Sequence, residues 1–374
     1  MHIKQLETPA LLISKPNLEA NAARMMAHAD ELGVILRPHV KTLKSVEAAK
    51  IYAPLGSRIT VSTLREAEAF AAVGYKDIFY AVGITPNKLE RATRLAKTGV
   101  DLTLLVDTVE AAQAISDASS QFDFPLTAMI EIDVDGQRAG VAWDSDALIP
   151  IAQALTVNGR LRGVATHAGG SYNCTSLEAM ADIAEQERTL TVKASKRLRE
   201  AGFEAPEVSV GSTPTALMAR DLTGVTELRA GVYATFDLVM AGLGICAIED
   251  IAMSVLTSVI GHQTDKGWVL VDAGWMAMSR DLGTSRQAGD QNYGLVCDAN
   301  GKAMPDYVLS SVNQEHGIIT RRDGASIDKS TFPYGAQLRI LPNHACATAA
   351  QFDRYTVLDA DNNQCATWSR VNAW

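Results

Sequence analysis

The feature that most constrains the fold is a regular alternation of short apolar runs with longer helical stretches between residues 16 and about 231. The short runs are rich in β-branched residues, a pattern typical of repeated strand-helix units around a parallel sheet. The eight predicted strands are 34–40, 59–63, 78–82, 102–106, 126–132, 163–167, 207–210 and 226–228. Eight such units favour a TIM-type (β/α)8 barrel over an open doubly wound sheet, which usually has fewer strands.

The stretches between these strands have the composition and the spacing of apolar residues expected of helices that cover a barrel. The predicted helices are 17–32, 64–73, 86–96, 109–118, 146–157 and 176–201. No Gly-x-Gly-x-x-Gly motif follows a predicted strand, so the sequence does not indicate a dinucleotide-binding fold.

After about residue 245 the pattern changes to Val, Ile and Thr runs that are broken by turn residues and have no long helices between them. These runs are 252–260, 268–272, 337–340 and 355–358. They predict a second, mainly antiparallel β domain, which the run 9–14 is expected to join. The chain is thus predicted to be an α/β protein with a barrel at 16–244 and a β domain made of 1–15 and 245–374.

Composition narrows the class of function. The net charge is -9 and no block of like charges is present, which disfavours nucleic acid or an anionic membrane as a partner. The apolar runs are too short for a membrane span, and the first residues lack the pattern of a secretion signal. Five scattered cysteines argue against a disulfide framework. We therefore expect a cytoplasmic enzyme with a small-molecule substrate.

The first predicted strand leads into Lys41, which is flanked by His39 and Thr42. Catalytic groups in barrels gather at the C-terminal ends of the strands. A lysine there can form a Schiff base with an aldehyde cofactor. The alternative is a surface lysine that closes a strand.

Two turns of small residues follow neighbouring predicted strands. The seventh strand leads into Gly211-Ser212-Thr213, and the eighth leads into a turn that contains Gly231 and Tyr233. Backbone N–H groups and hydroxyls in such turns can hold a phosphate. Each turn alone has an ordinary structural explanation, but two on adjacent strands favour an anion site.

Further polar residues follow the fifth and sixth predicted strands. Arg138 comes after a glycine turn and is placed to contact the ring of an aromatic cofactor. His167 and Tyr172 bring an imidazole and a phenol to the same rim. Single His or Tyr residues are more often packed than catalytic.

A second candidate site lies some 300 residues later, at His344 and Cys346. Two positions apart on a strand or turn, these side chains are expected to point to one face and to share a divalent metal. Two protein ligands leave positions open for water and substrate, and an imidazole with a thiolate suits Zn²⁺. The alternative is a buried structural cysteine beside a loop histidine.

Together these segments resemble a known family. The stretches 37–42 and 342–346 are accompanied by an Asp-x-Asp-Gly-x-Arg-x-Gly-Val turn, the Gly-Ser-Thr turn and a Glu-x-Arg-x-Gly-x-Tyr strand. This set is similar to the alanine-racemase-type fold that binds pyridoxal 5'-phosphate (PLP). More narrowly it resembles the group that contains D-serine dehydratase, D-threo-3-hydroxyaspartate dehydratase and D-threonine aldolase.

The resemblance implies a role for each candidate residue. Lys41 would carry PLP as a Schiff base and act as the base at Cα of the substrate, and Arg138 would contact the ring. Gly211, Ser212, Thr213, Gly231 and Tyr233 would hold the phosphate, while His39, His167 and Tyr172 would complete the cofactor pocket. The role of Arg229 is open, since not every relative keeps this arginine. Members of the group are dimers, so a homodimer is expected.

Within the group, dehydratases carry His-x-Cys where typical D-threonine aldolases carry His-x-Asp. The pair His344 and Cys346 therefore predicts a D-3-hydroxyamino acid dehydratase that yields a 2-oxo acid and ammonia. An aldolase that releases glycine and an aldehyde is the main alternative, followed by a racemase and by a non-catalytic PLP carrier. Leu43 stands where relatives often have histidine, and this departure predicts a substrate preference different from that of the named relatives. Arg280 and Arg286 are candidates for binding a second substrate carboxylate.

Overall fold

A computed structural model describes residues 3–374 of the chain, which divide into two compact units. The barrel unit comprises Arg24–Gly231 with Ala373–Trp374, and the β unit comprises Val232–Asn372 together with the N-terminal segment up to Ala23. The domain bounds predicted from the sequence are 16–244 for the barrel and 1–15 with 245–374 for the β domain. They stay a prediction. Within the described part of the chain, no helix is both long and apolar enough to cross a membrane.

The barrel unit contains the eight parallel strands that the sequence predicts. In sheet order they are β2 (Ile35–Pro38), β10 (Glu227–Ala230), β9 (Glu207–Val210), β8 (Arg160–Thr166), β6 (Thr127–Asp133), β5 (Asp101–Val106), β4 (Asp77–Gly83) and β3 (Ile59–Val61). A parallel bridge between His39 and Thr60 joins the two ends of this order, and a short strand β7 (Val141–Ala142) pairs with β6. The predicted barrel is therefore confirmed.

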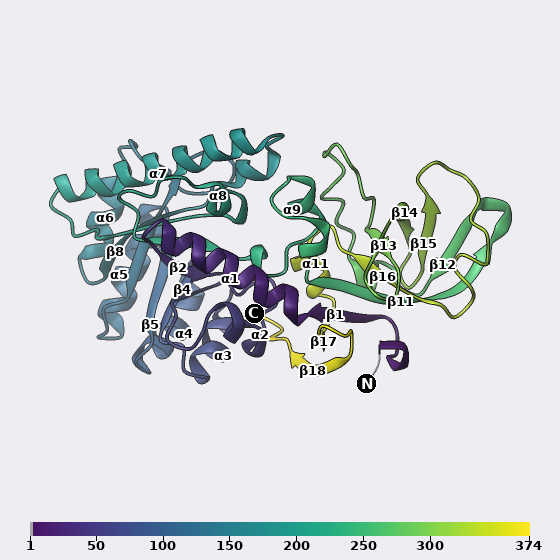
Figure 1. Cartoon of the computed structure of the whole chain (residues 1–374). Coiled ribbons are helices and arrows are strands. Elements are labelled where there is room, and N and C mark those ends of the chain that lie inside the picture. The colour runs from purple at the N-terminus through teal and green to yellow at the C-terminus, as the bar shows by residue number, and fades with distance from the viewer. Residues whose placement is uncertain (1–2) are drawn as a thin grey trace. The chain divides into compact units, whose positions relative to one another are not determined.

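Helices follow the strands and cover the outside of the barrel (Figure 1). They are α2 (Val46–Tyr52), α3 (Leu64–Ala72), α4 (Pro86–Lys97), α5 (Val109–Gln121), α6 (Leu148–Thr156), α7 (Leu177–Glu200) and α8 (Thr213–Met218). The helix α1 (Lys15–Glu31) precedes β2, and its residues are divided between the two units. The N-cap residues of α3, α5 and α7 are Thr63, Thr108 and Ser176. Each of their side chains accepts a hydrogen bond from a backbone N–H of the first turn. The short helix α2 was not predicted, since seven residues carry little periodic signal.

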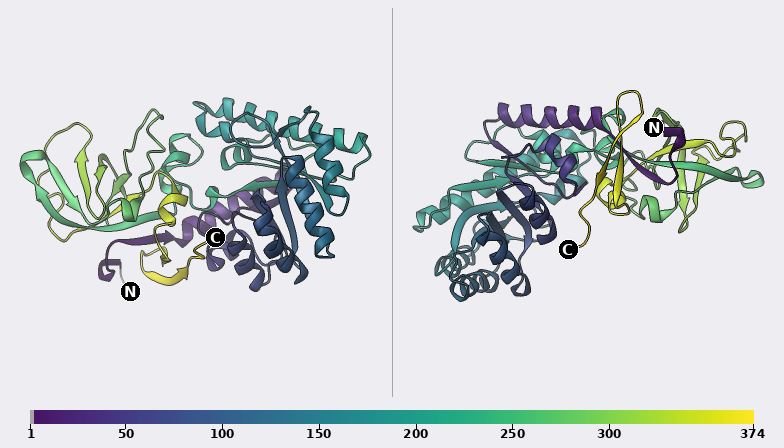
Figure 2. Two further views of the ribbon diagram at one scale, coloured as in Figure 1. Left: turned by 180° about the vertical axis from the view of Figure 1, so that it is seen from behind. Right: turned by 90° about the horizontal axis from the view of Figure 1, so that it is seen from below.

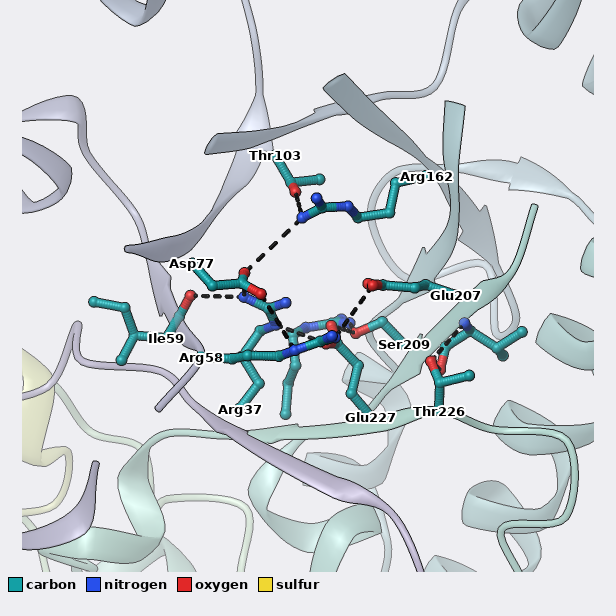
Figure 3. A network of polar contacts seen from close by, with 12 residues as sticks. Arg37, Arg58, Ile59, Asp77, Thr103, Arg162, Glu207, Ser209, Thr226 and Glu227 are labelled. Atoms are coloured by element: carbon teal, nitrogen blue, oxygen red, sulfur yellow. Dashed lines mark hydrogen bonds and ion pairs between the residues drawn. The ribbon is translucent and has the colours of Figure 1, made fainter. Parts of the chain in front are cut away.

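The N-terminal end of the barrel is closed by a network of charged side chains (Figure 3). Arg37, on β2, has a side chain only 1% exposed; its Nε lies 2.8 Å from Glu227 Oε2 and its Nη1 lies 2.7 Å from Asp77 Oδ1. Arg58 adds contacts of 3.1 Å to Glu227 and 3.2 Å to Glu207. Above this network the apolar side chains of Phe79, Leu105, Met129 and Ala165 pack together inside the barrel. The opposite, C-terminal end is left for the functional groups.

The β unit is built on one nine-stranded sheet that is mainly antiparallel. In sheet order its strands are β12 (Trp268–Val271), β15 (Gly317–Arg321), β14 (Ala303–Val312), β13 (Leu295–Cys297), β16 (Gln337–Leu341), β11 (Met253–Gln263), β1 (Ala10–Ser14), β17 (Arg354–Leu358) and β18 (Gln364–Ser369). The N-terminal strand β1 pairs with β11 and β17, as the run 9–14 predicted, and Figure 2 shows it beside the β17–β18 hairpin. Three short helices, α9 (Leu238–Gly242), α10 (Trp275–Met278) and α11 (Ala345–Ala349), lie in its connections.

Candidate active site

Lys41 lies in the turn that directly follows β2 and its bridge residue His39. Its positive charge lowers the pKa of both His39 and His167, so Lys41 lies close to both imidazoles. Residues that the sequence placed at the ends of two different strands therefore meet at the C-terminal end of the barrel. This is where parallel barrels carry their chemistry.

Burial is the main cause of the low pKa of both histidines. His39 has a pKa well below its ordinary value, because burial and then the charges of Lys41 and Arg229 disfavour the imidazolium. Its Nε2 lies 3.4 Å from Ser62 Oγ. For His167, burial followed by the charges of Lys41 and Arg138 lowers the pKa to about 3. Both imidazoles are therefore neutral at physiological pH.

The low pKa of His167 predicts a dependence of stability on pH. In the unfolded chain His167 titrates near 6.5, whereas in the folded protein its pKa is about 3. Between these values the unfolded state binds a proton that the folded state does not, so stability falls as the pH drops below 6.5. We expect His167→Asn to lose less thermal stability than the wild type between pH 7.5 and about pH 5, measured as the change in Tm of each protein.

The asparagine amide can still reach the carbonyl that His167 contacts, Gly211 O at 3.3 Å from Nδ1. His316→Asn is the matched control, because that imidazole is exposed in the turn between β14 and β15. Equal acid sensitivity in His167→Asn and the wild type would contradict the neutral, buried imidazole.

Arg138 and Tyr172 stand near His167 on two neighbouring loops. Arg138 follows β6, its side chain is 63% exposed, and its Nη2 lies 3.4 Å from Glu131 Oε1. The carboxyl of Glu131 has a raised pKa because it is buried, although Arg138 acts against this. The ring of Tyr172 lies 6.3 Å from that of His167, centroid to centroid. An exposed guanidinium beside two rings can contact a flat anionic cofactor at this rim.

The predicted phosphate turn begins with a glycine that no other residue can replace. Gly211 has φ +128°, and a Cβ atom there would lie 2.1 Å from Arg229 O. Ser212 caps α8, with its Oγ accepting from Thr215 N and lying 3.0 Å from Ser171 Oγ. Thr213 is the first residue of this helix and is buried. Small residues are therefore needed where the chain passes close to β10.

The backbone N–H groups of this turn are partly used inside the protein, which the sequence did not indicate. Gly211 N donates to Glu187 Oε1 at 3.0 Å, and Ser212 N donates to Thr215 Oγ1 at 2.9 Å. The same Glu187 oxygen accepts from Ala168 N at 3.1 Å. Glu187 thus ties the loop after β8 to the loop after β9.

Sequence reasoning missed Glu187, although one signal was present. It lies on the buried stripe of α7, whose other members at helical spacing are Met180, Ala184, Thr191, Ala194 and Leu198. A carboxylate on an apolar stripe must find partners in the interior. Burial raises the pKa of Glu187, while the N–H groups of Gly211 and Ala168 act against this rise.

Arg229, whose role the sequence left open, lies inside the barrel and is almost fully buried. Its guanidinium donates to Ser209 Oγ and to Thr166 O and stands 5.3 Å from the centroid of the Phe79 ring. Gly231 ends β10 close to His39, since a Cβ atom there would lie 3.1 Å from His39 O. Tyr233 belongs to the β unit, in a 3-10 turn at Val232–Ala234, where full burial raises its pKa.

The pair His344 and Cys346 lies in the β unit, and its predicted local structure is wrong. The strand β16 ends at Leu341, and His344 is the N-cap of helix α11, with Cys346 in the first turn of that helix. Pro342 cannot extend the sheet hydrogen bonding, and the run Ala345–Ala349 favours helix. The two side chains nevertheless meet, because the thiol of Cys346 hydrogen-bonds the side chain of His344.

Two carboxylates surround this pair. Asp281 Oδ2 lies 2.9 Å from His344 Nδ1. This hydrogen bond and then the one with Cys346 raise the pKa of His344 to about 11. Asp237 is buried, which raises its pKa to about 6, and it accepts from Ala345 N at 3.0 Å. No sequence motif linked Asp237 or Asp281 to the pair, because both are far away along the chain.

The two sets of residues fit the two groups that the sequence predicts. The barrel end offers an amine, two neutral imidazoles and the positive charges of Lys41, Arg138 and Arg229, which suits an anionic aldehyde cofactor. His344 and Cys346 offer nitrogen and sulfur in direct contact, which suits a divalent metal such as Zn²⁺. Among residues 3–374 no cluster of three or more His, Cys, Asp or Glu side chains is arranged for a metal.

Comparison with known proteins gives two family models along the chain. Residues 13–238 match the model described as "Alanine racemase, N-terminal domain". Residues 252–358 match the model described as "Putative serine dehydratase domain". The first spans the barrel and the second spans most of the β unit.

Relatives match over the whole length. The chain is 54% identical to D-threo-3-hydroxyaspartate dehydratase of Delftia sp. strain HT23, over 99% of this chain and 98% of the relative. It is 31% identical to D-serine dehydratase of Dictyostelium discoideum, over 100% of this chain and 98% of the relative. A D-threonine aldolase of Arthrobacter sp. is 27% identical over 95% of this chain and 90% of the relative.

The solved structure of the Delftia enzyme superposes with a TM-score of 0.98 at 52% identity, and the match covers 100% of both chains. Solved variants of a D-threo-3-hydroxyaspartate dehydratase, each 52% identical to this chain, include one with a histidine replaced by alanine and one with a cysteine, two positions further along, replaced by alanine. The cysteine variant is described as the metal-free form. The chain therefore belongs to the alanine-racemase-fold family that includes D-threo-3-hydroxyaspartate dehydratase and D-serine dehydratase.

Proposed function

We propose that the chain is a PLP- and metal-dependent dehydratase of D-3-hydroxyamino acids, which converts its substrate to a 2-oxo acid and ammonia. The observation that carries this proposal is the contact between His344 and Cys346 in a chain that also has Lys41 at the end of a barrel strand. Solved variants of D-threo-3-hydroxyaspartate dehydratase support it, since those at a histidine and a cysteine with the same spacing include a metal-free form. The name of the Delftia relative makes D-threo-3-hydroxyaspartate the first substrate to test.

The proposed roles follow from the chemistry of each group. Lys41 would bind the cofactor and then, with its Nζ free, remove the proton from Cα of the substrate. His39 and His167 add no charge to the site because both are neutral. Arg138 would contact the cofactor ring, Tyr172 would complete the pocket, and Gly211, Ser212, Thr213, Gly231 and Tyr233 would hold the phosphate. When bound, PLP supplies an electron sink for the electrons left at Cα, and the metal supplies a Lewis acid for the departing β-hydroxyl group.

The metal, the assembly and the compartment are further parts of the proposal. Zn²⁺ is the proposed metal, because imidazole and thiolate ligands suit it better than Mg²⁺ or Mn²⁺. A homodimer is proposed from the resemblance to the family. A cytoplasmic location is supported by the five cysteines, all in the described part of the chain, none of which forms a disulfide.

Retro-aldol cleavage is the second candidate, favoured by distant aldolase relatives such as the D-threonine aldolase at 27% identity. A racemase or a PLP carrier would need no metal, so both alternatives conflict with the donor pair His344 and Cys346. We keep the dehydratase because a thiolate ligand distinguishes this pair from the His-x-Asp of typical aldolases.

Product analysis tests the proposed function. PLP-loaded protein is given D-threo-3-hydroxyaspartate, D-serine or D-threonine, and ammonia with 2-oxo acid is measured against glycine with aldehyde. We expect ammonia release that a chelator abolishes and Zn²⁺ restores, with Cys346→Ala as a variant that Zn²⁺ fails to restore, because it lacks the thiolate ligand. Glycine as the main product would show an aldolase instead, and activity that a chelator leaves unchanged would remove the metal from the proposal.

A further inference from the structure

We propose that Asp281 is a positioning residue for the metal site: its carboxylate holds the Nδ1–H of His344 and thereby turns Nε2 toward the metal. This inference rests on the proposed metal dependence but goes beyond it, since it concerns a residue outside the His-x-Cys motif. Asp281 lies in the segment after helix α10, 63 positions before His344. Nothing in the sequence around it indicates a metal site.

The first step of the argument is the contact with the imidazole. Asp281 Oδ2 lies 2.9 Å from His344 Nδ1, and the two side chains are 30% and 45% exposed. A carboxylate can only accept, so Nδ1 keeps its proton, and Nε2 is the nitrogen whose proton a bound metal would displace to use the lone pair. Histidine ligands in proteins almost always donate their second ring N–H in this way, which fixes the tautomer and makes the ring a stronger ligand.

The second step is that Asp281 is itself held in place by the residue that precedes the ligand. The side chain of Asn343 is buried, and its Nδ2 donates to Asp281 O at 3.0 Å and also donates to Asn292 O. On the other side, Asp281 N donates to Ser279 Oγ at 3.3 Å. The segment that carries the carboxylate is therefore tied directly to the chain beside His344. Because the backbone of Asp281 is held on both sides, its carboxylate can orient the imidazole ring.

The third step separates this role from that of the neighbouring carboxylate. Asp237 is fully buried and accepts from Ala345 N and Met240 N, each at 3.0 Å. It fixes the backbone between the two ligands and joins α11 to α9, so its replacement is expected to disturb folding. Asp281 is partly exposed, and its carboxylate contacts the His344 ring and the backbone N–H of Gly283 in its own segment. Its replacement should leave the fold intact and change only the affinity for metal.

The experiment measures metal affinity rather than activity. Wild type, Asp281→Ala and Asp281→Asn are stripped of metal, and their Kd for Zn²⁺ is measured by competition with a chelating dye. We expect Asp281→Ala to bind Zn²⁺ about 10–100-fold more weakly. The Zn²⁺ affinity of Asp281→Asn should lie between those of the wild type and Asp281→Ala, because the amide oxygen still accepts from Nδ1 but carries no charge. The visible spectrum of the Co²⁺-substituted protein should change in the same order, since it reports the ligand geometry.

Asp323→Ala is the matched control. Asp323 is an aspartate of the β unit with a 56% exposed side chain, against 30% for Asp281, and it is paired with Arg321 at 2.6 Å. The control should bind Zn²⁺ like the wild type, and all variants should keep the Tm of the metal-free protein and the absorbance of bound PLP. Unchanged Zn²⁺ affinity and an unchanged Co²⁺ spectrum in Asp281→Ala would overturn the positioning role alone. A wild-type protein that binds none of Zn²⁺, Mn²⁺ and Mg²⁺ would overturn the proposed metal dependence and, with it, this role.

Discussion

Replacing Lys41 by alanine will abolish the visible absorbance of bound PLP and the release of ammonia. The positive charge of the Lys41 side chain lowers the pKa of both His39 and His167, so its amine lies near both imidazoles. Loss of a positioned proton-transfer group alone costs about 10²–10⁴-fold in rate, and here the residue that binds the cofactor is lost as well. Absorption spectra after dialysis and single-turnover product assays measure the two effects.

Lys44→Ala is the control for this experiment. Lys44 lies three positions further along the same turn, but its Nζ pairs with Glu66 Oε2 at 3.2 Å. We expect Lys44→Ala to keep the absorbance of bound PLP. If the band survived in Lys41→Ala, another lysine would have to bind the cofactor, and the assignment of the site would be wrong.

The second large effect is on stability, and it concerns Arg37 at the other end of the same strand. Arg37 is buried and paired with Glu227 and Asp77, and these carboxylates raise its pKa even though burial acts in the opposite direction. Arg37→Ala leaves these two carboxylates without their buried partner, which costs about 3–5 kcal/mol. For a unit of this size the expected loss of Tm is roughly 6–20 °C.

Thermal unfolding followed by circular dichroism measures this loss, with Tm used as an operational value because a chain with two units need not unfold in one step. Arg91→Ala is the control, since Arg91 pairs with Glu68 at 2.7 Å on the surface and should change Tm little. A double variant, Arg37→Met with Glu227→Leu, should regain part of the loss, because it removes both members of the pair whose two side chains are fully buried. A Tm of Arg37→Ala equal to that of the control would contradict the stabilising role of the network in Figure 3.

The segment 37–42 serves both the stability of the barrel and the proposed active site. Arg37, His39 and Lys41 alternate along β2 and the turn after it. The first closes the N-terminal end of the barrel, and the last lies at the end where barrels bind their ligands. The resemblance of the segment 37–42 to a family motif thus includes a residue that holds the fold.

Much of the fold could be predicted because its signals are local. Each barrel strand is a short run rich in β-branched residues, and each covering helix is a longer stretch with helical periodicity. Eight such repeats therefore predicted the barrel without any long-range information. The same holds for β1, whose run of apolar residues indicated a strand of the β unit. Element ends were less accurate, since the cap and turn hydrogen bonds that set them were not visible in the pattern.

Less of the candidate site than of the fold could be predicted from the sequence. The sequence named residues by type and by place at strand ends, and those predictions stay proposals until the variants are made. It assigned a strand or turn to His344 and Cys346, whereas they begin a helix, because Pro342 and the alanine-rich run that follows outweigh the preceding strand. The two side chains still interact, so the prediction that they share a metal did not depend on the secondary structure predicted for them.

The sequence by itself determined the order of strands and helices, the barrel, the place of Lys41 after the first barrel strand and the presence of an imidazole and a thiol two positions apart. Only the tertiary structure decided which side chains surround them. Glu187 reaches Gly211, Asp281 reaches His344 and Asp237 reaches Ala345 across separations of 24, 63 and 108 residues. Contacts of this kind leave no periodic signal, because they depend on where the fold brings distant segments together and on the need of each buried or half-buried polar group to find a partner.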